Sequence, residues 1–250
     1  MTITHRLVGS GEHGVVVLHD WFGTSAGWGP FPEYLDGSAF SYAFLDYRGY
    51  GERAAVEGEY SLAEIAGDAL ALADQLGWER FSLVGHSMGG KAAQQVLALA
   101  PERVRKLAGV APVAASAYEL GEAYDLFHGA AGEPGNRRAI IDLVTGNRAT
   151  GVWLDRMVAN SLASSRPEAF SSYLEQWTTV DLSAEVSGLR LPARAFVGEH
   201  DLALNEDYYR STWLTHYPEG DLELLPASGH YPMQETPVAF ATTLERFLGE

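Results

Sequence analysis

The sequence predicts an α/β fold, with a mostly parallel β-sheet that carries helices on both faces and a helical cap insertion. Three observations support this prediction. Short apolar runs that are rich in β-branched or aromatic residues alternate with amphipathic helical stretches. Several of the runs end in Gly-rich turns. A stretch in the second half of the chain is helix-like throughout and lacks such runs.

The apolar runs predict the strands of the sheet. Their continuous hydrophobicity is typical of strands that are buried on both faces of a parallel sheet. Connections between such strands are right-handed almost without exception. Strands are expected at residues 15–18, 42–45, 81–84, 104–110, 193–197 and 222–225.

The amphipathic stretches predict three core helices. Ser61 and Glu64 form a capping-box pattern at the start of the first, and Gly77 follows its end. Thr236 is the expected N-cap of the last, with a proline at its first position. Helices are expected at residues 62–76, 91–99 and 237–247.

The domain organisation follows from the break in this alternation. Residues 114–181 hold helix-like pieces separated by Gly and Pro, and no linker-like composition flanks them. We therefore expect residues 1–113 and 182–250 to form one core and residues 114–181 to form a helical cap on it. A chain of 250 residues is long enough to bury such a core without disulfides or structural metals.

Composition and charge exclude several classes of partner. A net charge of −16 opposes binding to nucleic acid and to anionic membrane surfaces. The sequence has no cysteine, no signal-peptide pattern and no apolar run long enough to span a membrane, so a cytoplasmic location is expected. No metal-ligand spacing is present, and we expect neither a metal nor a cofactor.

Ser87 is the candidate nucleophile. Residues 85–89 read G-H-S-M-G between a predicted strand and a predicted helix, which is the context that a G-x-S-x-G nucleophile turn requires. Gly85 and Gly89 avoid Cβ clashes in such a sharp turn. The following helix directs its N-terminal N–H groups at the reacting atom.

Two downstream residues can activate this hydroxyl. A serine hydroxyl needs a base, and His230 follows the strand at 222–225. The base needs an acid that orients it, and Asp201 follows the strand at 193–197. Loops at the carboxyl ends of parallel strands meet at one edge of the sheet, so the three side chains are expected there together. We expect His230 to titrate near its reference pKa of about 6.5.

With these residues the chain resembles the alpha/beta-hydrolase superfamily, in the branch that has a helical cap. The resemblance covers the core well and the cap weakly. It implies the alpha/beta-hydrolase fold, with Ser87 as nucleophile, Asp201 as acid and His230 as base. Residues 46–51, D-Y-R-G-Y-G, are similar to a turn that is structural in that family.

The resemblance also implies an oxyanion hole. Its donors would be the backbone N–H groups of Met88 and Trp21, with Phe22 as the alternative to Trp21. The family usually has His-Gly in the early loop, and this chain has His-Asp, so Asp20 stands where a glycine is usual. We expect the Asp20 side chain to point away from the oxyanion and to hydrogen-bond within its own loop.

Other interpretations of these motifs are weaker. Residues 85–91 also match the G-x-x-x-x-G-K phosphate-loop pattern, but Ala92 stands where a magnesium-binding Ser or Thr is required. His19 and His86 flank the turns and are expected to be structural donors. Among the cap aromatics, Trp177 and Trp153 are the candidates to face Ser87 and to bind substrate.

The predicted activity is hydrolysis of a small to medium carboxylic ester or lactone through an acyl-enzyme. Two alternatives stay open, because fold and triad do not determine the reaction. The same triad could cleave C–C bonds in diketone-like substrates or perform cofactor-free oxygen or peroxide chemistry. The chain could also be a small-molecule receptor or a signalling partner with vestigial hydrolase activity.

Overall fold

The computed structural model describes residues 2–250, which contain a seven-stranded sheet in the order β1-β3-β2-β4-β5-β6-β7. Strand β1 pairs antiparallel with β3, and every other pairing is parallel. The predicted fold class is thereby confirmed. The strands are β1 (His5–Gly9), β2 (His13–Leu18), β3 (Phe40–Leu45), β4 (Phe81–His86), β5 (Val104–Val110), β6 (Ala193–Gly198) and β7 (Gly220–Leu225).

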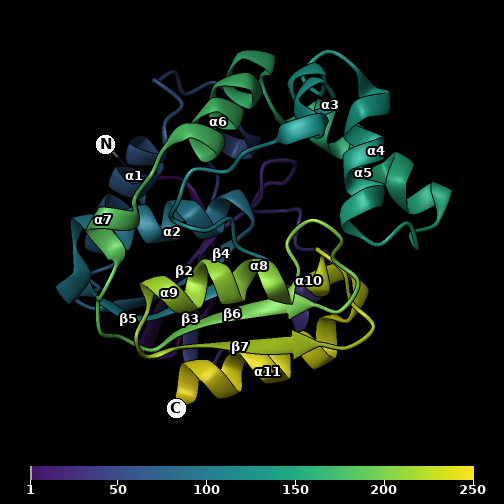
Figure 1. The fold of residues 1–250 in the computed structure, drawn as a ribbon. Helices are drawn as coiled ribbons and strands as arrows, with labels where there is room; N and C mark the ends of the chain where they lie inside the picture. Colours follow the sequence, from purple (N-terminus) through teal and green to yellow (C-terminus); the bar gives the residue numbers. More distant parts are fainter. Residues whose placement is uncertain (1) are drawn as a thin grey trace.

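Helices cover both faces of the sheet. In Figure 1 helix α11 lies on the opposite face from α2, α8 and α9. The core helices are α1 (Leu62–Gln75), α2 (Met88–Leu99), α7 (Ser183–Val186), α8 (Glu206–Ser211), α9 (Trp213–His216), α10 (Pro232–Glu235) and α11 (Pro237–Gly249). The short 3-10 helices are η1 (Phe31–Tyr34), η2 (Gly51–Arg53), η3 (Pro101–Arg103) and η4 (Gly121–Ala123).

The predicted helix caps are present in part. The Ser61 hydroxyl accepts the N–H of Glu64 at 3.1 Å, and Gly77 follows the helix with a φ of 73°. Thr236 is the N-cap residue of α11, but its side chain makes no capping hydrogen bond. Its N–H instead donates to Pro232 at 2.9 Å, which joins α11 to the preceding turn α10.

Four further helices lie between β5 and β6. They are α3 (Tyr124–Gly129), α4 (Pro134–Val144), α5 (Gly151–Ser164) and α6 (Pro167–Thr179), and Figure 1 shows them gathered at the top of the molecule. The N–H of Leu182 donates to Ala115 at 2.9 Å, and the N–H of Tyr118 donates to Thr178 at 2.8 Å. The chain therefore leaves and rejoins the core at one place. Within residues 2–250 no helix has the length and hydropathy needed to cross a membrane.

Candidate active site

Ser87 occupies a strained turn between β4 and α2. Its φ is 54° and its ψ is −118°, a conformation that costs a residue with a Cβ about 1–3 kcal/mol. Main-chain hydrogen bonds hold the turn: the N–H of Ser87 donates to Val110 at 2.9 Å, and its carbonyl accepts from Gly90 at 2.9 Å. The surrounding structure thus imposes a backbone that raises the Ser87 side chain above the strand end.

The two motif glycines allow close packing around this turn. A Cβ on Gly85 would lie 2.3 Å from the carbonyl oxygen of Gly89. A Cβ on Gly89 would lie 2.4 Å from the carbonyl oxygen of His19, at the start of the loop that follows β2, called the early loop here. Side chains at either position would push the turn away from its neighbours, so the G-x-S-x-G pattern is a packing requirement here.

His230 and Asp201 form a buried hydrogen-bonded pair. His230 Nδ1 lies 2.6 Å from Asp201 Oδ2, and both side chains are shielded from solvent. The other oxygen, Asp201 Oδ1, accepts the N–H groups of Ala203 and Leu204 at 2.9 and 3.0 Å. This fixes the carboxylate and therefore leaves Nε2 of the ring facing away from it.

Charge raises the pKa of His230 above its usual value of 6.5. Burial lowers this pKa, but the charge of Asp201 and its hydrogen bond raise it by more. The carboxylates of Asp20 and Glu235 add to the rise. The expectation of titration near 6.5 is therefore revised upward.

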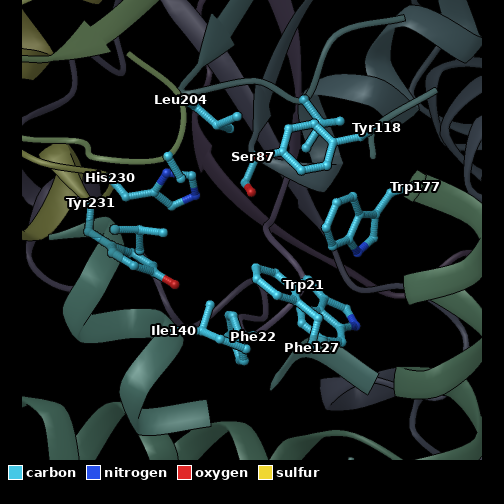
Figure 2. Close-up of a pocket in the computed structure, with 13 residues that line it drawn as sticks. Trp21, Phe22, Ser87, Tyr118, Phe127, Ile140, Trp177, Leu204, His230 and Tyr231 are labelled. Carbon is cyan, nitrogen blue, oxygen red and sulfur yellow. The ribbon is translucent and has the colours of Figure 1, made fainter. Parts of the chain in front are cut away.

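Ser87 and His230 line the same cavity. Figure 2 shows the Ser87 hydroxyl and the imidazole entering it from adjacent sides. Within residues 2–250 the structure gives no hydrogen bond to this hydroxyl, so it can turn toward the ring. The volume of the cavity is about 50 Å³, and its other walls are mostly apolar: Trp21, Phe22, Val113, Tyr118, Phe127, Ile140, Val144, Trp177, Ala203, Leu204 and Tyr231.

The early loop has one backbone N–H group without an acceptor and another that is hydrogen-bonded. Among residues 2–250 the backbone N–H groups of Trp21 and Met88 have no hydrogen-bond acceptor. The N–H of Phe22 donates to Asp20 Oδ2 at 3.3 Å. Trp21 is thus the available donor of this loop. Its indole holds the loop to α6 by donating to the carbonyl oxygen of Phe170 at 2.8 Å.

The Asp20 carboxylate bonds within its loop, as expected, and also beyond it. Besides the N–H of Phe22, it accepts the hydroxyl of Tyr231 at 2.9 Å. His86 Nδ1 lies 3.6 Å from its other oxygen. The contact with Tyr231 was missed by sequence reasoning, because it joins positions 211 residues apart.

The two tryptophans proposed to bind substrate lie in different places. Trp177 lines the cavity, whereas Trp153 lines a separate hollow and packs edge-on against Tyr231. The indole of Trp153 donates to Gln234 Oε1 at 3.0 Å. The structure therefore brings Trp177 to Ser87 and does not bring Trp153 there.

His19 and His86 are both buried and bonded to the main chain. His19 Nδ1 lies 2.7 Å from the carbonyl oxygen of Asp20, and His86 Nε2 lies 2.8 Å from that of His230. A carbonyl can only accept, so each ring donates a proton there. The His86 contact links the end of β4 to the loop that carries His230, and the His19 contact lies within the early loop.

Comparisons with known proteins show the family of this chain. The sequence model described as alpha/beta hydrolase fold matches residues 15–169. The 2-hydroxymuconate semialdehyde hydrolase of Pseudomonas putida is 30% identical over 213 residues, which are 81% of this chain and 74% of that protein.

Solved structures show the same fold over nearly the whole chain. An esterase from Exiguobacterium antarcticum superimposes with a TM-score of 0.87 at 21% identity, covering 99% of this chain and 96% of that one. The enol-lactonase from Burkholderia xenovorans LB400 gives a TM-score of 0.82 at 23% identity, with coverages of 99% and 96%. Since the family match spans more than half of the sequence and the fold agrees with it, this chain belongs to the alpha/beta hydrolase family.

Proposed function

We propose that this hydrolase cleaves carboxylic esters or lactones with a short acyl group, through an acyl-enzyme formed on Ser87. The observation that carries the proposal is the shared cavity. A serine on a strained turn and an imidazole held at 2.6 Å by a buried carboxylate both face one small, mostly apolar space.

Acylation begins at the hydroxyl of Ser87. Its oxygen attacks the ester carbonyl carbon, and Nε2 of His230 takes its proton. Asp201 stays ionised and stabilises the imidazolium that forms. The tetrahedral intermediate collapses when the imidazolium gives its proton to the departing alcohol oxygen, which breaks the ester bond.

Deacylation repeats these steps with water. His230 takes a proton from water, the hydroxide oxygen attacks the acyl carbon, and the serine oxygen leaves with the proton. In both halves the carbonyl oxygen becomes negative. The N–H groups of Met88 and Trp21 are its donors, since each lacks an acceptor within residues 2–250.

The size of the cavity sets the expected acyl chain. A volume of about 50 Å³ holds only a few water-sized groups, so we expect acetyl and propionyl chains to be preferred over longer ones. The ring of Trp177 forms one wall and limits this space.

An acyl-chain series tests the proposal. Hydrolysis of p-nitrophenyl acetate, butyrate and octanoate is measured, and a fluorophosphonate probe is reacted with the protein and mapped by mass spectrometry. We expect the highest kcat/KM on acetate and a covalent adduct on Ser87. An unlabelled Ser87 together with no turnover on any ester would contradict the proposal.

Hydrolysis of a C–C bond is the second candidate, because the Pseudomonas putida relative is a 2-hydroxymuconate semialdehyde hydrolase. The lining of the cavity favours neutral esters over such an anionic substrate: its thirteen residues include no lysine or arginine. Unpaired carboxylates are poorly tolerated in apolar surroundings. Turnover of a vinylogous diketone acid at a higher kcat/KM than p-nitrophenyl acetate would favour C–C cleavage.

A further inference from the structure

The carboxylate of Asp20 is buried at the junction of three segments of the active site. It is 5% exposed. Its Oδ2 accepts the hydroxyl of Tyr231 at 2.9 Å and the N–H of Phe22 at 3.3 Å. Its Oδ1 lies 3.6 Å from Nδ1 of His86. Asp20 thus contacts its own loop after β2, the loop that carries His230 and Tyr231, and the end of β4.

This carboxylate is ionised at neutral pH. Burial raises the pKa of Asp20, but the ring of His86 and the hydroxyl of Tyr231 outweigh burial and bring it to about 2. Burial and the nearby carboxylate raise the pKa of Tyr231 well above 10, so its hydroxyl keeps its proton and remains a donor. A hydrogen bond between a phenol and a carboxylate is stronger than a neutral one.

The hydrogen bond from Tyr231 links Asp20 to the main chain of His230. Tyr231 is the next residue, and its ring is anchored through its hydroxyl. His86 donates from Nε2 to the carbonyl oxygen of His230 at 2.8 Å. On the third side, the N–H of His230 donates to Val144 at the end of α4. The backbone around the imidazole is therefore held both by His86 at the end of β4 and by Val144 at the end of α4.

We propose that Asp20 is a positioning residue for His230, acting through Tyr231, and that its negative charge stabilises the imidazolium formed during each half-reaction. The inference rests on the proposed function. This role accounts for the presence of an ionised carboxylate in a buried place, where a charge without partners is costly. The same carboxylate binds the N–H of Phe22 and so leaves Trp21 as the free donor.

The charge of Asp20 acts alongside other groups that face His230. The imidazole contacts Asp201 directly, and Asp20 and Glu235 contribute through charge. The ring of His86 lies 5.0 Å away, centroid to centroid, and burial lowers its pKa. Removing the charge of Asp20 alone therefore leaves the main partner of the imidazole in place and should move its titration to lower pH.

Three variants separate position from charge. Asp20→Asn keeps one acceptor oxygen for Tyr231 and Phe22, removes the charge and replaces the other oxygen by an NH2 group. Asp20→Ala loses both, and Tyr231→Phe loses one hydrogen bond. Tyr42→Phe is the matched control, because its hydroxyl also donates to a carboxylate at 2.9 Å, that of Glu245, outside the site.

We expect the plateau kcat of Asp20→Ala to fall about 10–100-fold, as misplacement of a catalytic group does. The kcat of Tyr231→Phe should fall by less. The double variant Asp20→Ala/Tyr231→Phe should be no slower than Asp20→Ala, since both substitutions break the same hydrogen bond. Tyr42→Phe should retain wild-type kcat. Losses that multiply in the double variant, or an equal loss in Tyr42→Phe, would overturn the positioning role.

A titration by NMR tests the charge without any substrate. The ring protons of His230, assigned by comparison with His230→Gln, are followed with pH in the wild type and in Asp20→Asn. We expect the midpoint to move to lower pH in Asp20→Asn. An unmoved midpoint overturns the inference. The result stands whether or not esters are turned over, so failure of the proposed function is recognised separately by the absence of turnover in the wild type.

Discussion

The ammonium group of Lys91 lies 3.0 Å from the main-chain oxygen of Trp177, and this contact ties helix α2 to helix α6. The same group donates to the carbonyl oxygen of Ser116 at 2.9 Å, and the side chain is fully buried. Lys91 is the lysine of the apparent phosphate-loop pattern. Its role in the structure is instead to hold the wall residue Trp177 above the serine turn.

Stability at alkaline pH should report on this lysine. Burial lowers the pKa of Lys91 from 10.5 to about 8. Between pH 8 and 10.5 the unfolded chain then binds more protons than the folded one, so Lys91 makes the free energy of unfolding rise with pH, by at most about 1.4 kcal/mol per pH unit. Urea unfolding of wild type and Lys91→Met across this range checks it. The free energy of unfolding of the wild type, measured relative to that of Lys91→Met, should rise with pH. Free energies that change in parallel with pH in the two proteins would contradict the prediction.

The sheet was largely predictable because its central strands are continuous apolar runs. Strand β1 (His5–Gly9) was missed, since it is a half-exposed edge strand with an ordinary polar composition. Helix α2 begins at Met88, three residues before its predicted start. Two glycines follow Met88, and they were interpreted as turn residues. In the structure they lie in the helix, and they are glycines because a Cβ at either position would clash with a neighbouring segment.

Only the site residues that directly follow a strand could be placed from the sequence. Asp201 and His230 each follow a strand, and parallel strands bring such loops together. The partners of Asp20 were not predictable, because a hydrogen bond to Tyr231 depends on side-chain packing across most of the chain. Trp153 shows the same limit, since its aromatic character alone does not reveal that it lines a different hollow from Trp177.

Replacing the nucleophile gives the most direct test of the mechanism. Ser87→Ala should lower kcat for p-nitrophenyl acetate by about 10⁴–10⁶-fold, because triad residues act as a unit. The substitution keeps the Cβ and the strained backbone, so the midpoint of thermal unfolding should stay close to that of the wild type. Turnover at the wild-type rate in a folded Ser87→Ala protein would contradict the role of this hydroxyl.

The pH dependence of kcat/KM should show the state of His230. Its neutral form is the base, and its pKa is raised above 6.5, chiefly by Asp201 acting against burial. Activity should therefore rise with pH through an inflection above 6.5. Asp201→Asn should move that inflection downward and lower kcat by about 10³–10⁴-fold. A wild-type profile that is flat from pH 5 to 9 would contradict the assignment of this base.

Enlarging the cavity should change which acyl chain is preferred. Trp177→Ala removes one wall of the space around Ser87 and should raise kcat/KM for p-nitrophenyl octanoate relative to acetate by about tenfold, since each methylene in an apolar pocket contributes about 1 kcal/mol or more. Trp153→Ala is the matched comparison, because that indole lines a different hollow and bonds to Gln234. Its ratio of octanoate to acetate rates should stay at the wild-type value. Equal changes in the two variants would mean that the cavity wall formed by Trp177 does not select the acyl chain, because Trp153 lies outside that cavity and contacts its lining residue Tyr231.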